Sequence, residues 1–130
     1  YDYALKMAAK PGEKRSRLSA TIQYFVNVEV LMRVSRRNFF PIPEVDAAIV
    51  RLTPLHIKHF VPFEIYQKTV KLLFNTPNRT LGKILKRRFG GRDRDRIISM
   101  LSRYGVNTKK RVRDLTNYEI ELIASIIEKV

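Results

Sequence analysis

The sequence lacks several features that many functions require. Its 130 residues include no cysteine, which excludes disulfides and thiolate metal sites and fits a reducing cytosolic compartment. No apolar run approaches the roughly 18 residues of a membrane-spanning helix. No signal peptide opens the chain, and Tyr1-Asp2-Tyr3 is not typical of a natural start. We therefore expect a fragment of a longer protein that acts in the cytoplasm and does not contact a membrane.

Recognisable catalytic and metal-binding patterns are also missing. His56 and His59 are three residues apart without an evident third ligand, so the spacing does not predict a metal site. Gly90-Gly91 belongs to no phosphate-binding or dinucleotide-binding pattern, and the scattered carboxylates suggest no acid–base pair. We predict that this chain contains no catalytic, cofactor-binding or metal-binding residues.

Positive charge is what the sequence has in excess. The net charge is +14, and half of the 26 Lys and Arg residues lie between Arg79 and Arg113, where Asp93 and Asp95 are the only carboxylates. Clustered positive charge favours binding of a polyanion through phosphate contacts and counterion release. A well-solvated surface, as in a thermophile, is the alternative, but the asymmetry favours nucleic acid.

The first part of the chain has the pattern of two strands. Residues 26–34 alternate apolar and polar, which predicts a half-buried strand, and 45–52 predicts a second, more buried one. We expect the two to pair antiparallel through the long connection at 35–44. That connection contains Phe39-Phe40-Pro41-Ile42-Pro43, and its prolines restrict the backbone to extended geometry.

The remainder has helical periodicity. Asn78 is expected to cap the helix at 79–89 and Gly90-Gly91 to end it, while Thr116 and Glu119 form a capping box at the start of the last helix. The expected helices are 18–25, 63–74, 79–89, 93–104 and the segment after Thr116. The chain thus divides into a strand-bearing domain, 1–55, and a basic helical domain, 56–130.

Three motifs in order resemble one family. They are Arg17-Leu18-Ser19 with Gln23-Tyr24, then Phe39-Phe40-Pro41-Ile42-Pro43-Glu44-Val45, then Gly105-Val106-Asn107 with Arg111, Leu115-Thr116 and Glu119. Together they resemble the KsgA-type ribosomal RNA adenine N6,N6-dimethyltransferases, in an archaeal-like form. The second motif, with the first upstream of it, is quite specific to this family and its relatives that methylate large-subunit rRNA.

The resemblance implies a fold and an activity. The chain would be an α/β fragment: the terminal strands of a Rossmann-like methyltransferase sheet plus a small all-helical C-terminal domain. Such enzymes use S-adenosylmethionine to dimethylate N6 of two adjacent adenosines in the 3′-terminal hairpin of small-subunit rRNA. They also act in ribosome assembly. The expected partner is therefore small-subunit rRNA, or the immature small subunit, bound by a monomer.

The resemblance also implies what lies outside the chain. The family's glycine-rich cofactor loop, acidic ribose-binding residue and Asn-(Leu or Ile)-Pro-Tyr catalytic motif would precede Tyr1. Residues 1–5 resemble the next strand of the family. A helix of the family pattern should follow, so we expect that a segment is missing between Leu5 and Lys6. On this interpretation the chain supplies only the substrate side of the enzyme.

The family match assigns candidate site residues. Phe39 would face the target adenine, aimed by Pro41 and Pro43, whereas Phe40 would pack; Phe39 as a core residue at a sheet edge is the alternative. A solvated surface residue is the alternative for each basic candidate, and Arg17 could instead be structural. The residues expected to bind RNA are Arg79, Lys83, Lys86, Arg87 and Arg88, with a basic loop of Lys10, Lys14, Arg15 and Arg17.

Two other functions remain open from the sequence. One is a non-catalytic rRNA-binding assembly factor or transcription factor of the same family. The other is an unrelated basic helical DNA-binding module. A paired hairpin that carries the Phe39 loop would argue against the second.

Overall fold

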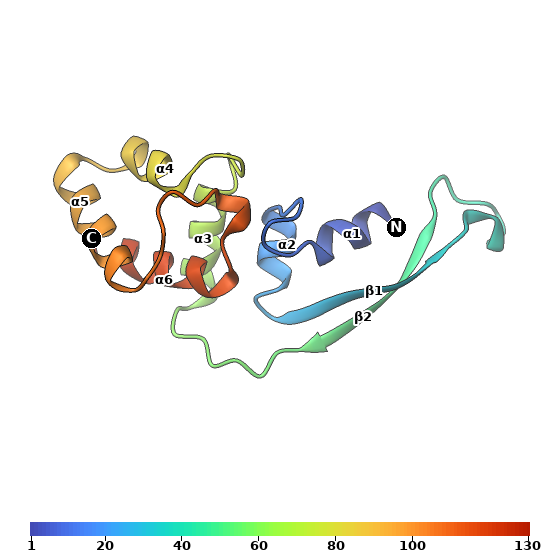
Figure 1. The fold of residues 1–130 in the computed structure, drawn as a ribbon. Helices are drawn as coiled ribbons and strands as arrows, with labels where there is room; N and C mark the ends of the chain where they lie inside the picture. The colour runs from blue at the N-terminus through green and yellow to red at the C-terminus, as the bar shows by residue number, and fades with distance from the viewer.

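The computed structural model describes all 130 residues (Figure 1). A helix pair opens the chain, a two-stranded sheet with a 3-10 turn between its strands follows, and four further helices with a second 3-10 turn complete it. In chain order the elements are α1 (Asp2–Ala8), α2 (Arg17–Ile22), β1 (Val26–Val34), η1 (Arg36–Asn38), β2 (Ala47–Pro54), α3 (Phe63–Leu73), α4 (Leu81–Arg88), α5 (Gly91–Arg103), η2 (Val112–Asp114) and α6 (Asn117–Glu128).

The two predicted strands form an antiparallel hairpin. β1 has the predicted bounds, and β2 pairs with it from Val26 opposite Pro54 to Val34 opposite Ala47, with a bulge at Leu31. The prediction that the second strand is the more buried one is wrong: Ile49 is 49% exposed and Leu52 is 52% exposed. The hairpin has no third strand, and helix α1 packs mainly against β1 and α2, so much of the apolar surface of β2 faces solvent.

The first residues are helical rather than extended. Helix α1 runs without a break through the Leu5–Lys6 bond, and the Leu5 amide donates to the Tyr1 carbonyl. Both the strand expected at 1–5 and the gap expected after Leu5 are therefore wrong. Ala4 is the one buried residue of this short helix, and Ala9 just after it is also buried, so small side chains make the close contacts here.

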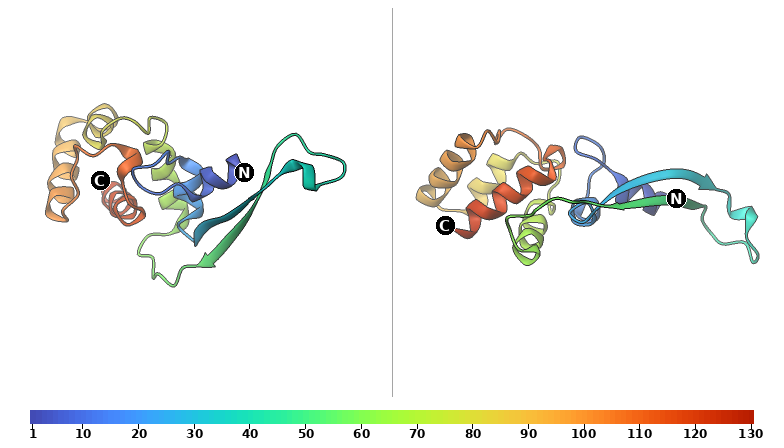
Figure 2. Two further views of the ribbon diagram at one scale, coloured as in Figure 1. Left: turned by 45° about the vertical axis from the view of Figure 1, so that its right-hand side comes forward. Right: turned by 90° about the horizontal axis from the view of Figure 1, so that it is seen from below.

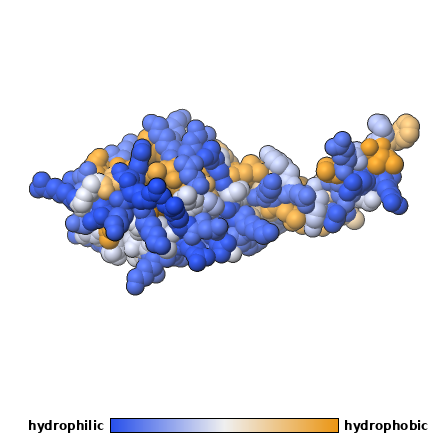
Figure 3. All heavy atoms as spheres, turned by 90° about the horizontal axis from the view of Figure 1, so that it is seen from above, coloured by the Kyte–Doolittle hydropathy of each residue, from blue (hydrophilic) through white to orange (hydrophobic).

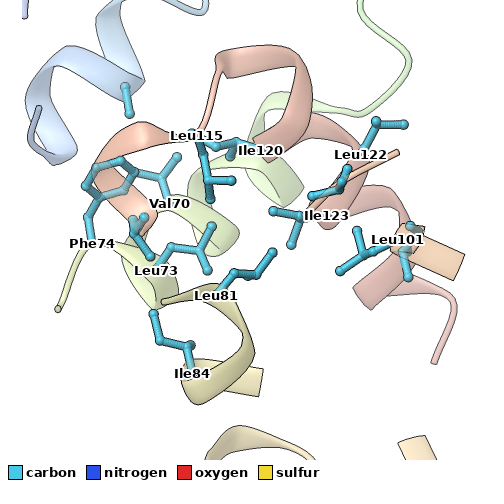
Figure 4. Packing of buried hydrophobic residues seen from close by; sticks show 14 of the residues in the cluster. Val70, Leu73, Phe74, Leu81, Ile84, Leu101, Leu115, Ile120, Leu122 and Ile123 are labelled. Carbon is cyan, nitrogen blue, oxygen red and sulfur yellow. The ribbon is translucent and has the colours of Figure 1, made fainter. Parts of the chain in front are cut away.

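A single apolar core holds the helical part together. It draws side chains from α3, α4, α5 and α6, which Figure 4 shows converging around Val70, Leu73, Leu81 and Ile123. The capping box of α6 forms as predicted, because the Thr116 hydroxyl accepts from the Glu119 amide while a Glu119 carboxylate oxygen accepts from the Thr116 amide. Ala20 and Tyr24 join this core, so α2 and the turn that follows it are tied to the helical part.

The ends of α4 and α5 differ from the sequence-based expectation. Thr80, not Asn78, caps α4, and Gly90 stands at the N-cap of α5 instead of ending α4. The segment before α6 positions the start of α4. Thr80 forms an antiparallel β-bridge with Arg111, and the Leu81 amide donates to the Lys110 carbonyl. Gly105 ends α5, in the left-handed conformation at φ +79° that glycine adopts without strain.

The molecule is elongated. Figure 2 shows the hairpin projecting from the helical part as a long arm, with α1 and α2 beside its base. The loop between the strands lies at the tip of this arm, and α5 lies near the opposite end of the molecule. None of the helices is long and apolar enough to cross a lipid bilayer.

Candidate RNA-contacting surfaces

The loop at the tip of the hairpin is closed by ionic hydrogen bonds. Asp46 accepts from the Arg36 amide at 2.9 Å and from the side chains of Arg33 and Arg36, with Arg33 Nη2 at 2.6 Å. These bonds, the Arg36 amide first, hold the pKa of the Asp46 carboxyl well below its usual range. Arg36 also donates to the Glu44 carbonyl at 2.6 Å. The segment from Asn38 to Pro43 is thus a loop whose two ends are fastened together.

This closed loop presents apolar side chains to solvent. Phe39 is 44% exposed, Phe40 is fully exposed and Ile42 is 62% exposed. The prediction that Phe40 packs is therefore wrong, since its ring extends beyond the loop with nothing covering it. Pro41 and Pro43 lie in the same loop and are exposed. Figure 3 shows apolar surface at the tip of the arm, whereas the helical part is mainly hydrophilic.

Helix α4 carries the main group of free cations. Its buried residues Leu81, Ile84 and Leu85 face the core, which turns its basic side chains outward. None of the ion pairs in the structure involves a residue of α4. Arg79, Arg87 and Arg88 line one shallow cleft together with Asn75, while Lys83 and Lys86 are exposed nearby on the same helix.

One residue of the predicted basic loop joins this surface. Arg17 is exposed and donates to Asn75 at 3.3 Å, which places it at the rim of the cleft that contains Arg79. Lys14 is exposed, and Lys10 donates to Asn27 at 3.0 Å, on the side of the hairpin base. The structure therefore brings Arg17 together with the α4 cations and leaves Lys10 elsewhere.

Arg15 does not belong to an RNA-contacting surface. It is 3% exposed, and its guanidinium donates to the Leu115 carbonyl at 2.7 Å and to the Asn117 side chain. Burial lowers the pKa of Arg15 from its ordinary value. Its assignment as an RNA-binding residue is wrong because the side chain is enclosed in the protein, where its two Nη groups fasten the basic loop to the start of α6.

Asn117 extends this buried network. Its amide donates to the Ala20 carbonyl at 3.2 Å and to the Tyr66 hydroxyl at 3.0 Å, and that hydroxyl donates to Ala20 at 2.7 Å. Burial raises the pKa of Tyr66 far above its ordinary value, so the hydroxyl stays a donor. The network joins α2, α3 and α6 around one point.

His59 has a structural role that its spacing did not indicate. Its ring stacks on Tyr24 with 3.6 Å between centroids, and its two nitrogens lie 2.7 Å from Glu121 Oε1 and 2.8 Å from the Tyr24 carbonyl. The Tyr24 carbonyl oxygen can only accept, so the His59 nitrogen that faces it is a donor. No group of three or more His, Cys, Asp or Glu residues is arranged to hold a metal ion.

The candidate surfaces lie far apart. In Figure 1 the hairpin tip and helix α4 are near opposite ends of the molecule, with the basic loop before α2 between them. Phe39 and the α4 cations therefore do not line one pocket. Any single RNA that touches both must extend along the molecule.

The chain matches the family model described as "Ribosomal RNA adenine dimethylase" over residues 2–129. The chain therefore belongs to the ribosomal RNA adenine dimethylase family, as its motifs indicated. This membership, with the paired hairpin that carries the Phe39 loop, argues against an unrelated DNA-binding module.

Relatives and solved structures agree with this assignment. A probable ribosomal RNA small subunit methyltransferase A from Pyrococcus abyssi is 33% identical over 132 residues, covering 98% of this chain and 47% of the relative. The protein of the same name from Methanococcus maripaludis strain C5 is 41% identical over 87 residues, covering 65% of this chain and 33% of the relative. The chain thus spans at most about half the length of these relatives.

Two solved structures share the fold. A dimethyladenosine transferase from Plasmodium falciparum superposes with a TM-score of 0.82 at 22% identity, covering 98% of this chain and 55% of that one. The 23S rRNA methyltransferase ErmE gives a TM-score of 0.61 at 23% identity, covering 98% and 51%. The expected α/β fragment of a methyltransferase fold is confirmed.

Proposed function

We propose that this chain is the substrate-side portion of an enzyme that dimethylates N6 of two adjacent adenosines in the 3′-terminal hairpin of small-subunit rRNA. The methyl donor would be S-adenosylmethionine, and the enzyme would act in the cytoplasm during ribosome assembly. Family membership and relatives named as small subunit rRNA methyltransferases support this proposal.

This chain itself is not suited to hold the cofactor. Its only two strands form a hairpin joined by an aromatic and proline-rich loop, so it has no strand–glycine loop–helix unit that could bind S-adenosylmethionine. No step of the methyl transfer is assigned to this chain's residues. Their proposed role is to bind and orient the RNA.

The observation that carries the proposal is the exposed Phe39 loop, fastened at its base by Asp46 and Arg36. An adenine must leave its stack before its exocyclic nitrogen can react, and an aromatic face compensates for the stacking that is lost. A loop fastened at both ends lowers the entropic cost of placing that face. Phe39, with Pro41 and Pro43 beside it, is the group proposed to meet the target adenine.

The basic surface supplies the complementary role. The cations Arg17, Arg79, Lys83, Lys86, Arg87 and Arg88 would contact RNA phosphates. Such contacts set the register of the RNA without identifying a base. A-form RNA is recognised largely by shape, which suits a wide surface of unpaired cations.

The deciding experiment is methyl transfer from labelled S-adenosylmethionine to undermethylated small-subunit particles by the full-length protein. Phe39→Ala should reduce turnover by about 5- to 150-fold, the worth of one aromatic–base stack, with a much smaller effect on particle binding. Ile42→Ala is the matched control, because it removes an exposed apolar side chain from the same loop. Equal losses of turnover and binding in Phe39→Ala would refute the assigned role.

The same assay distinguishes the enzyme from the second candidate function, a non-catalytic rRNA-binding factor of the same family. Particle binding without any methyl incorporation would favour a non-catalytic assembly or transcription factor. Absence of binding would contradict both candidates.

A further inference from the structure

A second aromatic surface lies on the helical part, away from the Phe39 loop. Phe60, in the segment between β2 and α3, meets Tyr118 of α6 edge to face with 6.0 Å between ring centroids. Phe60 is 50% exposed and Tyr118 is 64% exposed. Two adjacent exposed rings offer stacking faces to a ligand.

The Phe60–Tyr118 pair borders a cavity. The cavity has a volume of about 350 Å³ and lies between the base of the hairpin, the segment after β2 and the first turn of α6. Ile57 and Asn27 also line it. This volume lies within the range of pockets that accept small organic molecules, and a single nucleotide falls in that size class.

The charge at this cavity suits an anion. Lys10 and Lys58 line it, and neither forms an ion pair in the structure, although the Lys10 ammonium donates to Asn27 at 3.0 Å. Glu121 is the only acidic residue in the lining, and both its oxygens are occupied. Oε1 accepts from His59 and Oε2 accepts from the Phe60 amide at 3.0 Å. The two lysines outnumber this single hydrogen-bonded carboxylate, so the lining of the cavity carries a net positive charge.

We propose that this cavity binds an unpaired nucleotide of the RNA, with its base against Phe60 and Tyr118 and its phosphate between Lys10 and Lys58. The inference rests on the proposed function in that it takes RNA as the partner. It adds a single-stranded contact, whereas the α4 cations suit a paired, A-form segment. In Figure 1 the segment after β2 passes below α3 while α4 lies above it, so the two contacts are on different sides of the helical part.

The test compares two RNA probes: a blunt duplex, and the same duplex with an unpaired adenosine- and uridine-containing extension. Wild-type chain should bind the extended duplex more tightly. Phe60→Ala with Tyr118→Ala should weaken binding of the extended duplex by about 5- to 150-fold per lost stack and leave binding of the blunt duplex unchanged. 5-Bromouridine in the extension should crosslink to the peptides that contain Phe60 or Tyr118.

Matched variants keep the test specific. Tyr118→Phe retains the ring and should bind as wild type, and Tyr3→Ala removes an equally exposed tyrosine from α1 without effect. Thermal melting of each variant checks that the fold is intact. Two results would overturn the inference. One is unchanged RNA binding by the double variant, which would leave the surface to a protein partner. The other is an equal loss of affinity for both probes. Failure of wild-type chain to bind either probe would instead contradict the proposed function.

Discussion

At the scale of single residues, burial separates cations that look alike in the sequence. Lys14 and Arg15 are neighbours in one basic loop, yet Lys14 is exposed and Arg15 is enclosed by Leu115 and Asn117. The buried guanidinium is stabilised there because both of its Nη groups find acceptors, although its Nε finds none. Arg15 therefore acts on the folding of the loop and not on RNA.

Removing this side chain should destabilise the protein. We expect Arg15→Ala to lower the free energy of unfolding by about 2–3 kcal/mol, because the Leu115 carbonyl and the Asn117 amide lose a charged hydrogen-bond donor. Urea unfolding followed by circular dichroism measures the change. Lys14→Ala is the control and should stay within about 0.5 kcal/mol of wild type. A stable Arg15→Ala variant with weakened RNA binding would restore Arg15 to the RNA-binding group.

The role of Arg15 could not be predicted because its partner is distant in the chain. Leu115 lies 100 positions away, and nothing in the local pattern Lys14-Arg15-Ser16-Arg17 marks which cation turns inward. The same holds for His59 and Glu121, which are 62 positions apart. Charge clustering predicts that a surface is basic, but the tertiary fold decides which members of the cluster reach solvent.

At the scale of elements, the segment between β2 and α3 is an ordered tether. His59 stacks on Tyr24 and bonds Glu121, while the Tyr24 hydroxyl donates to the Val61 carbonyl at 2.7 Å. Burial raises the pKa of the Tyr24 hydroxyl, which keeps it a donor at neutral pH. These contacts fix the direction in which the chain leaves the hairpin and enters the helical part.

Loss of the His59 ring should loosen this tether. His59→Ala leaves an oxygen of the buried Glu121 side chain without its hydrogen-bond partner, so we expect a loss of about 1–3 kcal/mol in unfolding free energy. Trypsin should then cleave after Lys58 faster than in wild type, which limited proteolysis with mass spectrometry detects. His56→Ala removes the exposed histidine of the same segment and should alter neither quantity. Cleavage at an unchanged rate in His59→Ala would contradict the tether.

Helices and strands could be predicted where a short stretch of sequence determines them. The capping box at Thr116 and the alternation along Val26–Val34 each fix an element within a few residues, and both were confirmed. The burial of β2 was not predictable in the same way. An apolar strand pattern indicates that a face can be covered, but it does not identify the segment that covers it.

At the scale of the whole molecule, proposed RNA contacts are spread along an elongated body. The Phe39 loop lies at one end and α4 near the other. This arrangement predicts that affinity and base selection are separable properties. The cations of α4 would control how tightly RNA binds, and the loop would control which base reacts.

Reversing two charges on α4 tests the first of these roles. We expect Lys83→Glu with Lys86→Glu to weaken RNA binding and to make the dependence of log affinity on log salt concentration shallower by about two, one for each lost phosphate contact. Filter binding or fluorescence anisotropy over a salt series measures both. Lys6→Glu with Lys129→Glu makes the same change in net charge at exposed positions on α1 and just after α6, outside the α4 surface. If the control pair lowers the affinity and the slope as much as the α4 pair, the effect belongs to net charge and α4 is not a specific contact. If only the α4 pair does so, the cations of this helix contact phosphates directly.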